Sequence, residues 1–145
     1  MKRVNLEEKR VYGMRIRTTN EKEMNPETAQ IGALWGKYFE KIFPTLTPEI
    51  KSYGVYSNYE SDASGAFDVT VSIDEKREDL EMLTLEAGAY LCFETKGELP
   101  QAVIDTWGEI WHYFANENCT DKRAFKTDFE LYLSESEAAI YIGIE

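Results

Sequence analysis

Cysteine and histidine are scarce in this chain. Cys92 and Cys119 lie far apart in sequence without a Cys-x-x-Cys partner, and His112 is the only histidine. Zinc sites built from Cys and His need about four such ligands. We therefore expect no metal ion and no cofactor. For the cysteines we expect two reduced thiols, with a disulfide between them as the alternative. The sequence also lacks a Ser/His/Asp or Cys/His pairing and a glycine-rich phosphate loop.

Long apolar runs and basic clusters are missing as well. Residues 1–8 lack the apolar run of a signal peptide, and no stretch approaches the roughly 20 apolar residues of a membrane helix. The 16 Lys and Arg residues are outnumbered by 27 Asp and Glu, which gives a net charge of −11. A chain this acidic repels phosphate backbones and attracts cations. We expect a cytoplasmic protein that binds neither membranes nor nucleic acid directly.

Aromatic residues, in contrast, are abundant at 13% of the chain, and many lie on two amphipathic helices. Asn25 and Pro26 are typical of a helix start, and Pro44 ends that helix. Its apolar face carries Ile31, Leu34, Trp35, Tyr38, Phe39 and Ile42. Pro100 opens a second helix. Its apolar face carries Val103, Ile104, Trp107, Ile110, Trp111 and Phe114.

Apolar alternation and short apolar runs predict six strands. These are residues 11–17, 53–59, 67–73, 88–95, 126–133 and 138–144. The segment 60–65 has turn composition, so 53–59 and 67–73 are expected to form an antiparallel hairpin. A second turn, 134–137, joins the last two strands. Residues 18–24 and the charged run 74–79 are interpreted as solvated connections.

The order strand–helix–strand–strand occurs twice, over residues of about 9–75 and 86–145. An offset of 107 − 35 = 72 places Trp35 on Trp107 and Phe39 on Trp111. Chance similarity between two amphipathic helices is the alternative. Neither half is long enough to bury its helix alone. We therefore predict one α+β domain over residues 1–145, with antiparallel sheets, two amphipathic helices and pseudo-twofold symmetry.

One carboxylate, Glu130, lies between aromatic and apolar neighbours in the strand 126–133. Alternation divides that strand into one face with Phe129, Leu131 and Leu133 and another with Asp128, Glu130 and Tyr132. On this pattern alone, Glu130 turns toward water while the apolar face turns toward the core, and Phe125 is also expected in the core. Surface positions are expected for Glu60, Asp68 and His112.

The ordered set of segments resembles the GyrI-like small-molecule-binding domain, which is also the effector-binding domain of AraC- and MerR-type multidrug-responsive regulators. The resemblance covers essentially the whole chain. It rests on Tyr53 to Glu60, Gly88-Ala89-Tyr90, Gly97 to Trp111 with its Trp-Gly-Glu-Ile-Trp stretch, and Asp128-Phe129-Glu130-Leu131-Tyr132. About ten residues precede the first expected strand, too few for a helix-turn-helix. The chain therefore resembles the stand-alone members.

This resemblance implies a cleft between the two repeats that takes amphipathic, cationic and aromatic compounds. It matches the family's buried acidic residue with Glu130, against the alternation. A carboxylate among rings has a raised pKa until a cation arrives, and the rings add cation–π attraction of about 0.5–2 kcal/mol. The expected ligand contacts are Glu130, Trp107, Trp111, Tyr90, Tyr132, Tyr141, Trp35, Tyr56 and Phe39.

Three functions compete at this point. The leading hypothesis is a binding protein for amphipathic cations, without enzymatic activity. The second is a hydrolase of reactive small molecules, in which Glu130 near Tyr132 or Tyr141 acts as a general base. The third is a protein-interaction module of the gyrase-inhibitor type. Its partner would be gyrase or a transcription regulator, and a homodimer is a further expectation.

Overall fold

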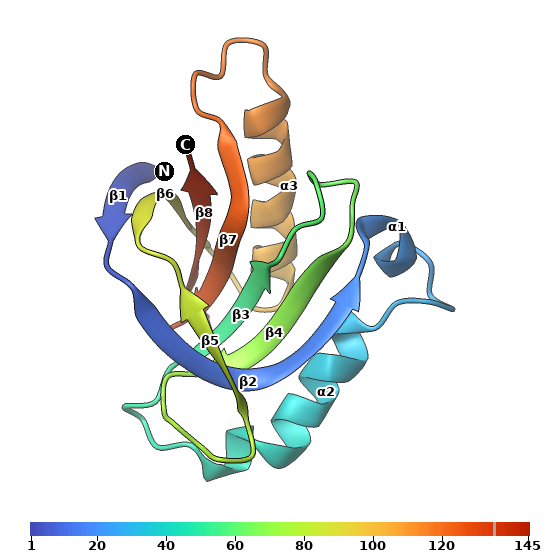
Figure 1. Cartoon of the computed structure of the whole chain (residues 1–145), viewed down its shortest axis with the longest axis vertical. Coiled ribbons are helices and arrows are strands. Elements are labelled where there is room, and N and C mark those ends of the chain that lie inside the picture. Colours follow the sequence, from blue (N-terminus) through green and yellow to red (C-terminus); the bar gives the residue numbers. More distant parts are fainter. Residues whose placement is uncertain (135) are drawn as a thin grey trace.

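The computed structural model describes residues 1–134 and 136–145, so Glu135, within the expected turn 134–137, lies outside the described residues. The described residues form eight strands and three α-helices (Figure 1). The strands are β1 (Lys2–Leu6), β2 (Lys9–Thr18), β3 (Ser52–Ser57), β4 (Phe67–Ile73), β5 (Glu81–Leu85), β6 (Gly88–Glu94), β7 (Arg123–Tyr132) and β8 (Ala138–Ile144). The helices are α1 (Asn20–Glu23), α2 (Ile31–Lys41) and α3 (Gln101–Ala115), and a 3-10 turn, Phe43–Thr45, follows α2.

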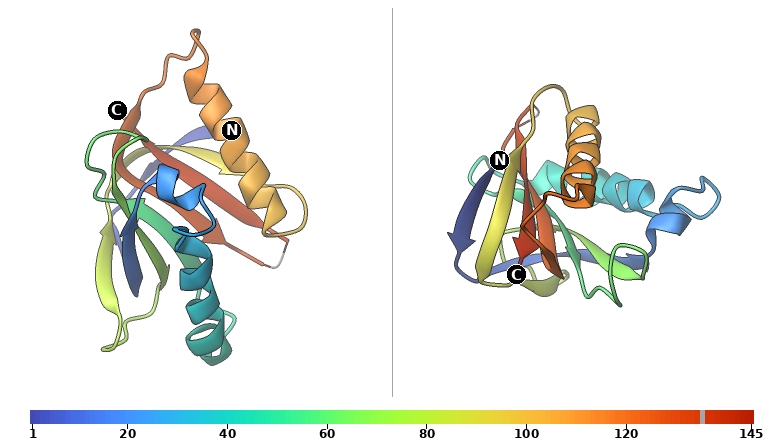
Figure 2. Two further views of the ribbon diagram at one scale, coloured as in Figure 1. Left: turned by 90° about the vertical axis from the view of Figure 1, so that its right-hand side faces the viewer. Right: turned by 90° about the horizontal axis from the view of Figure 1, so that it is seen from above.

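All eight strands belong to one antiparallel sheet, in the order β1-β6-β8-β7-β3-β4-β2-β5. This confirms an α+β fold, although a single sheet takes the place of the expected separate sheets. β3 and β4 form the expected antiparallel hairpin. β3 and β7 are neighbours at the middle of the sheet. α2 and α3 both lie on the same side of the sheet, so the two central strands run beneath them (Figure 2).

Four elements differ from the sequence-based expectation: the edge strands β1 and β5, helix α1 and the start of α2. β1 and β5 were not predicted, because each is a five-residue edge strand with mostly exposed or half-buried side chains and hence weak alternation. Helix α1 occupies the expected polar connection, and α2 begins at Ile31 instead of at Asn25-Pro26. The carboxylate of Glu23 accepts hydrogen bonds from the Gln30 and Ile31 N–H groups, at distances of 2.9–3.1 Å, and so satisfies the start of α2.

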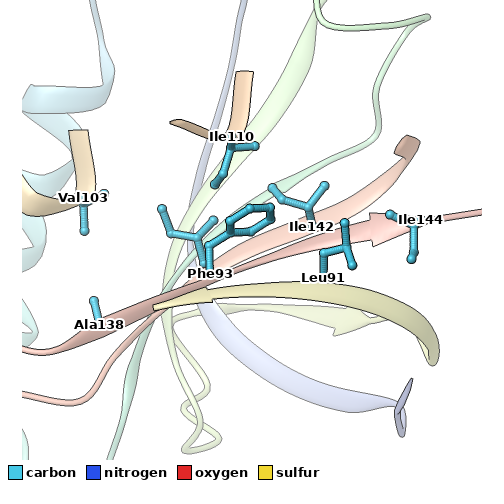
Figure 3. Packing of buried hydrophobic residues seen from close by; sticks show 8 residues of the cluster. Leu91, Phe93, Val103, Ile110, Ala138, Ile142 and Ile144 are labelled. Carbon is cyan, nitrogen blue, oxygen red and sulfur yellow. The ribbon is translucent and has the colours of Figure 1, made fainter. Parts of the chain in front are cut away.

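The hydrophobic core is divided by the sheet. On the helix side, α3 packs Val103 and Ile110 on β6 and β8 (Figure 3), and α2 packs Leu34 and Tyr38 on β4. On the opposite side a third cluster contains Val11, Tyr53, Val55, Leu85, Tyr90 and Phe129. β7 is therefore covered on both faces. The expectation that one of its faces meets water is wrong, because the helices lie over it.

Burial corrects several further expectations. Leu133 is 46% exposed, because β7 ends one residue before it. Asp68 is buried and paired with Arg15 and Arg17, instead of lying at the surface. Three residues of the apolar helix faces are exposed by more than half: Phe39, Ile104 and Trp111.

Both cysteines are free. Within the described residues, no helix combines the length and the apolar character that a membrane crossing requires.

Candidate functional site

Glu130 lies at the centre of the sheet, on the side that faces the helices. Its side chain is 2% exposed, and Gly54 of β3 lies directly opposite it. Both carboxylate oxygens accept hydrogen bonds. Tyr132 donates to Oε1 at 2.6 Å, while Tyr56 and the Trp107 Nε1–H group donate to Oε2 at 2.9 Å and 2.7 Å. The resemblance correctly placed Glu130 inside the protein.

Two tryptophan–tyrosine pairs enclose this carboxylate. Trp35 of α2 meets the ring of Tyr132 edge-on, with centroids 5.2 Å apart. Trp107 of α3 meets the ring of Tyr56 in the same way at 5.3 Å. Each helix thus contributes one indole and each central strand one phenol. The carboxylate is surrounded by the flat faces and edges of four aromatic side chains.

Two more aromatic residues extend this enclosure toward solvent. Trp111 lies one turn along α3, with its ring 6.3 Å from that of Trp107, and it is 54% exposed. Phe39 lies one turn along α2, with its ring 5.9 Å from that of Trp35, and it is 55% exposed. These two side chains continue the aromatic surface from the buried carboxylate to the outside of the protein.

Burial controls the electrostatics of this cluster. Loss of hydration raises the pKa of Glu130, while the hydrogen bonds from Tyr132, Trp107 and Tyr56 act in the opposite direction and offset part of the shift. Burial and the neighbouring Glu130 charge raise the pKa values of Tyr56 and Tyr132, so both phenols remain neutral donors. The ion pairs within the described part of the chain involve other carboxylates.

A second buried carboxylate, Asp128, precedes Glu130 by two residues and was not singled out from the sequence. It is fully buried. Its Oδ2 accepts hydrogen bonds from Tyr59 at 2.5 Å and from Arg123 Nη2 at 2.7 Å, and its Oδ1 accepts one from the Gly143 N–H at 2.8 Å. Alternation does place Asp128 on the same face as Glu130. No sequence signal joins it to Arg123, however, because that contact depends on an irregularity in β7.

The structure brings together some of the expected contact residues and separates others. Trp35, Tyr56, Trp107 and Tyr132 surround Glu130, and Phe39 and Trp111 flank them. Tyr90 and Tyr141 lie on the opposite side of the sheet, where both rings pack on Phe129 with centroid distances of 5.6 Å and 4.7 Å. Gly54 is a site residue that the sequence reasoning missed, although it stands in one of the stretches that carry the resemblance.

This arrangement can attract a positive charge. A buried carboxylate held only by neutral donors retains unused electrostatic attraction for a cation. The surrounding rings offer apolar area and negative π-faces to the same ligand. Within residues 1–134 and 136–145, no three His, Cys, Asp or Glu side chains converge as metal ligands do. His112 is exposed on α3, as expected.

Comparison with known proteins gives consistent matches along the whole chain. A family model described as Cass2, integron-associated effector binding protein, matches residues 4–144. The chain is 31% identical over 159 residues to YobU of Bacillus subtilis (strain 168), provisionally named a transcriptional regulator, and the alignment covers 97% of this chain and 94% of YobU.

Similar solved structures include the following two. An integron cassette protein from the mobile metagenome of Vibrio cholerae is 42% identical, with a TM-score of 0.94 and coverage of 99% of this chain and 95% of that one. The protein SAV2435, solved bound to tetraphenylphosphonium, has a TM-score of 0.73 at 16% identity, with coverage of 99% and 93%. At 16% identity, the similarity to SAV2435 shows a shared fold.

Proposed function

Since the chain belongs to the Cass2 family of integron-associated effector binding proteins, we propose that it binds hydrophobic organic cations against Glu130, between α2 and α3. Membership of this family confirms the effector-binding resemblance seen in the sequence. The observation that carries the proposal is that Glu130 is buried and accepts hydrogen bonds from three neutral groups, while the ion pairs among the residues that the structure describes leave it without a basic partner.

The physics of desolvation favours a large and delocalised cation. A compact ammonium ion loses much hydration when it enters an apolar enclosure, whereas an aromatic cation is weakly hydrated to begin with. Its rings can stack on those of Trp35, Trp107, Tyr56 and Tyr132, and each favourable ring contact contributes about 0.5–2 kcal/mol. The ligand of SAV2435, tetraphenylphosphonium, has this chemistry, which supports the proposal by fold-level analogy.

Ligand entry requires the aromatic rings to separate, because they now pack against one another. The exposed side chains of Phe39 and Trp111 mark the outer end of the aromatic surface, and we place the entrance there. Helix side chains can turn without breaking the sheet, whereas Glu130 is fixed on a central strand. The ligand therefore moves the walls while its charge is drawn to a stationary partner.

The strand order supports an internal duplication. Outward from the centre, one half of the sheet reads β3-β4-β2-β5 and the other reads β7-β8-β6-β1. β2, α2, β3 and β4 thus correspond in chain order to β6, α3, β7 and β8. On the proposed duplication, Trp35 and Trp107 are equivalent residues of one pseudo-twofold domain over residues 1–145, and the proposed cleft lies between its two halves.

Hydrolysis by the same site is a second candidate. The raised pKa of Glu130 is the property of a general base. Both of its oxygens are already occupied by donors, however, which supports binding over activation of a water molecule. Hydrolysis would be favoured if the wild type released product from an ester substrate and the Glu130→Gln variant did not.

The binding function is tested by tryptophan fluorescence titration with tetraphenylphosphonium and with tetraphenylborate, which has the same shape and the opposite charge. We expect the phosphonium to bind the wild type more tightly, and its affinity to fall about tenfold or more in Glu130→Gln. Glu117→Gln, which removes the same charge from an exposed position, is the matched control and should bind as the wild type does. Equal affinity for both ions, or an unchanged affinity in Glu130→Gln, contradicts the proposal.

A further inference from the structure

Two buried carboxylates lie on the same face of β7, and they are compensated in different ways. Asp128 and Glu130 are two residues apart, which corresponds to about 6–7 Å along a strand. Glu130 is held by neutral donors, whereas Asp128 forms an ion pair of 2.7 Å with Arg123. The helix-side face of β7 therefore carries one compensated and one uncompensated negative charge.

The aromatic wall of the proposed ligand site extends from one carboxylate to the other. Tyr56 is opposite Asp128 in the β3–β7 register, while its hydroxyl donates to Glu130. Its ring packs on Phe67 at 6.0 Å, and Phe67 in turn packs on Tyr59, the hydrogen-bond partner of Asp128, at 5.7 Å. A ligand that displaces Tyr56 would therefore meet both carboxylates along one surface.

The fold brings Arg123 to Asp128 at a local conformational cost. In a regular strand, residues 123 and 128 would point to opposite faces, because they are an odd number of positions apart. A register shift between them removes this mismatch, and Phe125 adopts the left-handed region with φ of 53°. Non-glycine residues enter that region at a cost of roughly 1 kcal/mol or more, and such strain is retained where a specific arrangement is needed.

The guanidinium group of Arg123 is buried, but its hydrogen-bond donors are only partly satisfied. Its side chain is 8% exposed, and its guanidinium carbon lies 4.5 Å from the centre of the Phe125 ring. Nη2 reaches both Asp128 and Tyr59, but Nε has no hydrogen-bond partner within the described residues. The pair thus lacks the two-bond geometry of the strongest arginine–carboxylate contacts, which indicates that charge balance, more than rigidity, is what Arg123 supplies.

We propose that Arg123 sets the charge preference of the ligand site: by neutralising Asp128, it leaves Glu130 as the single free negative charge and so favours monocations over dications. This inference rests on the proposed function. A second positive charge on the ligand would be desolvated beside a carboxylate that already has a partner, and it would also be repelled by the guanidinium. Without Arg123, Asp128 becomes the partner of that second charge.

Ethidium and propidium test this inference, because they share one aromatic cation and propidium carries a second, quaternary ammonium on a propyl chain. We expect wild-type protein to prefer ethidium. In Arg123→Met, the ratio of the propidium Kd to the ethidium Kd should fall by about tenfold or more, since an unpaired opposite charge nearby shifts such equilibria by one to three powers of ten. An unchanged ratio in a folded Arg123→Met protein overturns the inference.

Three further variants complete the experiment. Arg10→Met removes one positive charge from an exposed position of β2 and should leave the ratio unchanged. Asp128→Asn keeps an amide oxygen for Arg123 while it removes the negative charge, so the ratio should rise, and this variant decides the matter if Arg123→Met does not fold. The double variant Arg123→Met/Asp128→Asn should return the ratio toward that of the wild type.

The same titrations separate this inference from the proposed function. If ethidium binding by otherwise wild-type protein is unaffected by Glu130→Gln, the proposed cation site itself is refuted. If ethidium binding depends on Glu130 but the propidium-to-ethidium ratio is the same with and without Arg123, only the role of Arg123 is refuted. The first result concerns the Glu130 charge and the second concerns the Asp128–Arg123 pair.

Discussion

Gly54 lies directly opposite Glu130 in the β3–β7 pairing, and the carboxylate of Glu130 occupies the space that a side chain at position 54 would fill. A Cβ atom at position 54 would lie 2.7 Å from Glu130 Oε1 and 3.1 Å from Trp35 Cζ2. The glycine is therefore required by close approach, and it permits both the carboxylate and the indole ring to occupy one small region above the sheet.

Gly54→Ala should consequently weaken the site and the fold together. The added methyl group must displace a carboxylate held by three hydrogen bonds or the ring of Trp35, so we expect a loss of about 1–3 kcal/mol in the free energy of unfolding. Affinity for tetraphenylphosphonium should fall as well. Chemical denaturation and fluorescence titration measure the two effects.

Gly36→Ala is the matched control for that substitution. Gly36 lies within α2, and nothing is within 4 Å of a Cβ atom added there. Alanine is the better helix former by roughly 1 kcal/mol, so this variant should be more stable than the wild type. If Gly54→Ala is also stabilising and binds normally, the packing of Glu130 against position 54 is not as tight as the distances indicate.

The raised pKa of Glu130 predicts a pH dependence of stability. Because the folded protein binds this proton more tightly than the unfolded chain, the corresponding stability is complete below the unfolded pKa of about 4.3 and is lost as the pH rises through the higher folded pKa. The unfolding free energy of the wild type minus that of Glu130→Gln should therefore decrease over this window and become constant above it. An increase with pH would contradict burial as the dominant cause.

Cation binding should change with pH in the opposite sense. Ionised Glu130 attracts the ligand and the protonated form does not, so affinity for tetraphenylphosphonium should rise as the pH passes through the folded pKa of Glu130. Fluorescence titrations at a series of pH values give the midpoint. In Glu130→Gln this rise should be absent, and a rise of equal size in that variant would assign the effect to another group.

Tyr132→Phe should move that midpoint upward. The hydroxyl of Tyr132 donates to Glu130 Oε1 at 2.6 Å and lowers the pKa of the carboxyl group, so its removal raises the pKa further. A hydrogen bond to a charged acceptor contributes about 1.5–3 kcal/mol, and a measurable loss of stability should accompany the shift. Tyr113→Phe is the control, since it removes a hydroxyl that donates to Asp121 at 2.5 Å near the end of α3. That variant should leave the midpoint in place.

Trp111→Ala should separate ligand binding from stability. With 54% of its surface exposed, Trp111 contributes little to the core, and the free energy of unfolding should change by about 0.5 kcal/mol or less. Loss of the ring should weaken phosphonium binding by about 0.5–2 kcal/mol. Ile104→Ala, which truncates a residue of α3 that is 59% exposed, should bind normally. Equal affinities in both variants would exclude Trp111 from the ligand wall.

Local sequence patterns were sufficient for the interior strands. β4 and β8 have the bounds expected from their apolar runs, because each is largely buried and consists mainly of residues that favour strands. The edge strands β1 and β5 gave no comparable signal. Each pairs on one side only, and most of its side chains are exposed or half-buried. Their strand conformation follows from neighbours that are distant in the chain.

The site was predicted in part, and the reasons can be read from individual residues. Resemblance placed Glu130 inside, whereas alternation placed it outside, and alternation failed because it cannot detect helices that cover a second face. Pattern and resemblance identified Trp107 and Tyr56 but grouped them with Tyr90 and Tyr141, which lie beneath the sheet. The Arg123–Asp128 pair escaped notice because a register shift reverses the face of Arg123.

The sequence by itself determined the α+β class, the two aromatic helices, the interior strands and the excess of negative charge, because these depend on composition and on short-range periodicity. Only the tertiary structure decided which aromatic rings meet Glu130, which carboxylate receives an arginine, and why position 54 must be glycine. Those contacts join β3, β7, α2 and α3, and they depend on strand register and on which face of the sheet the helices cover.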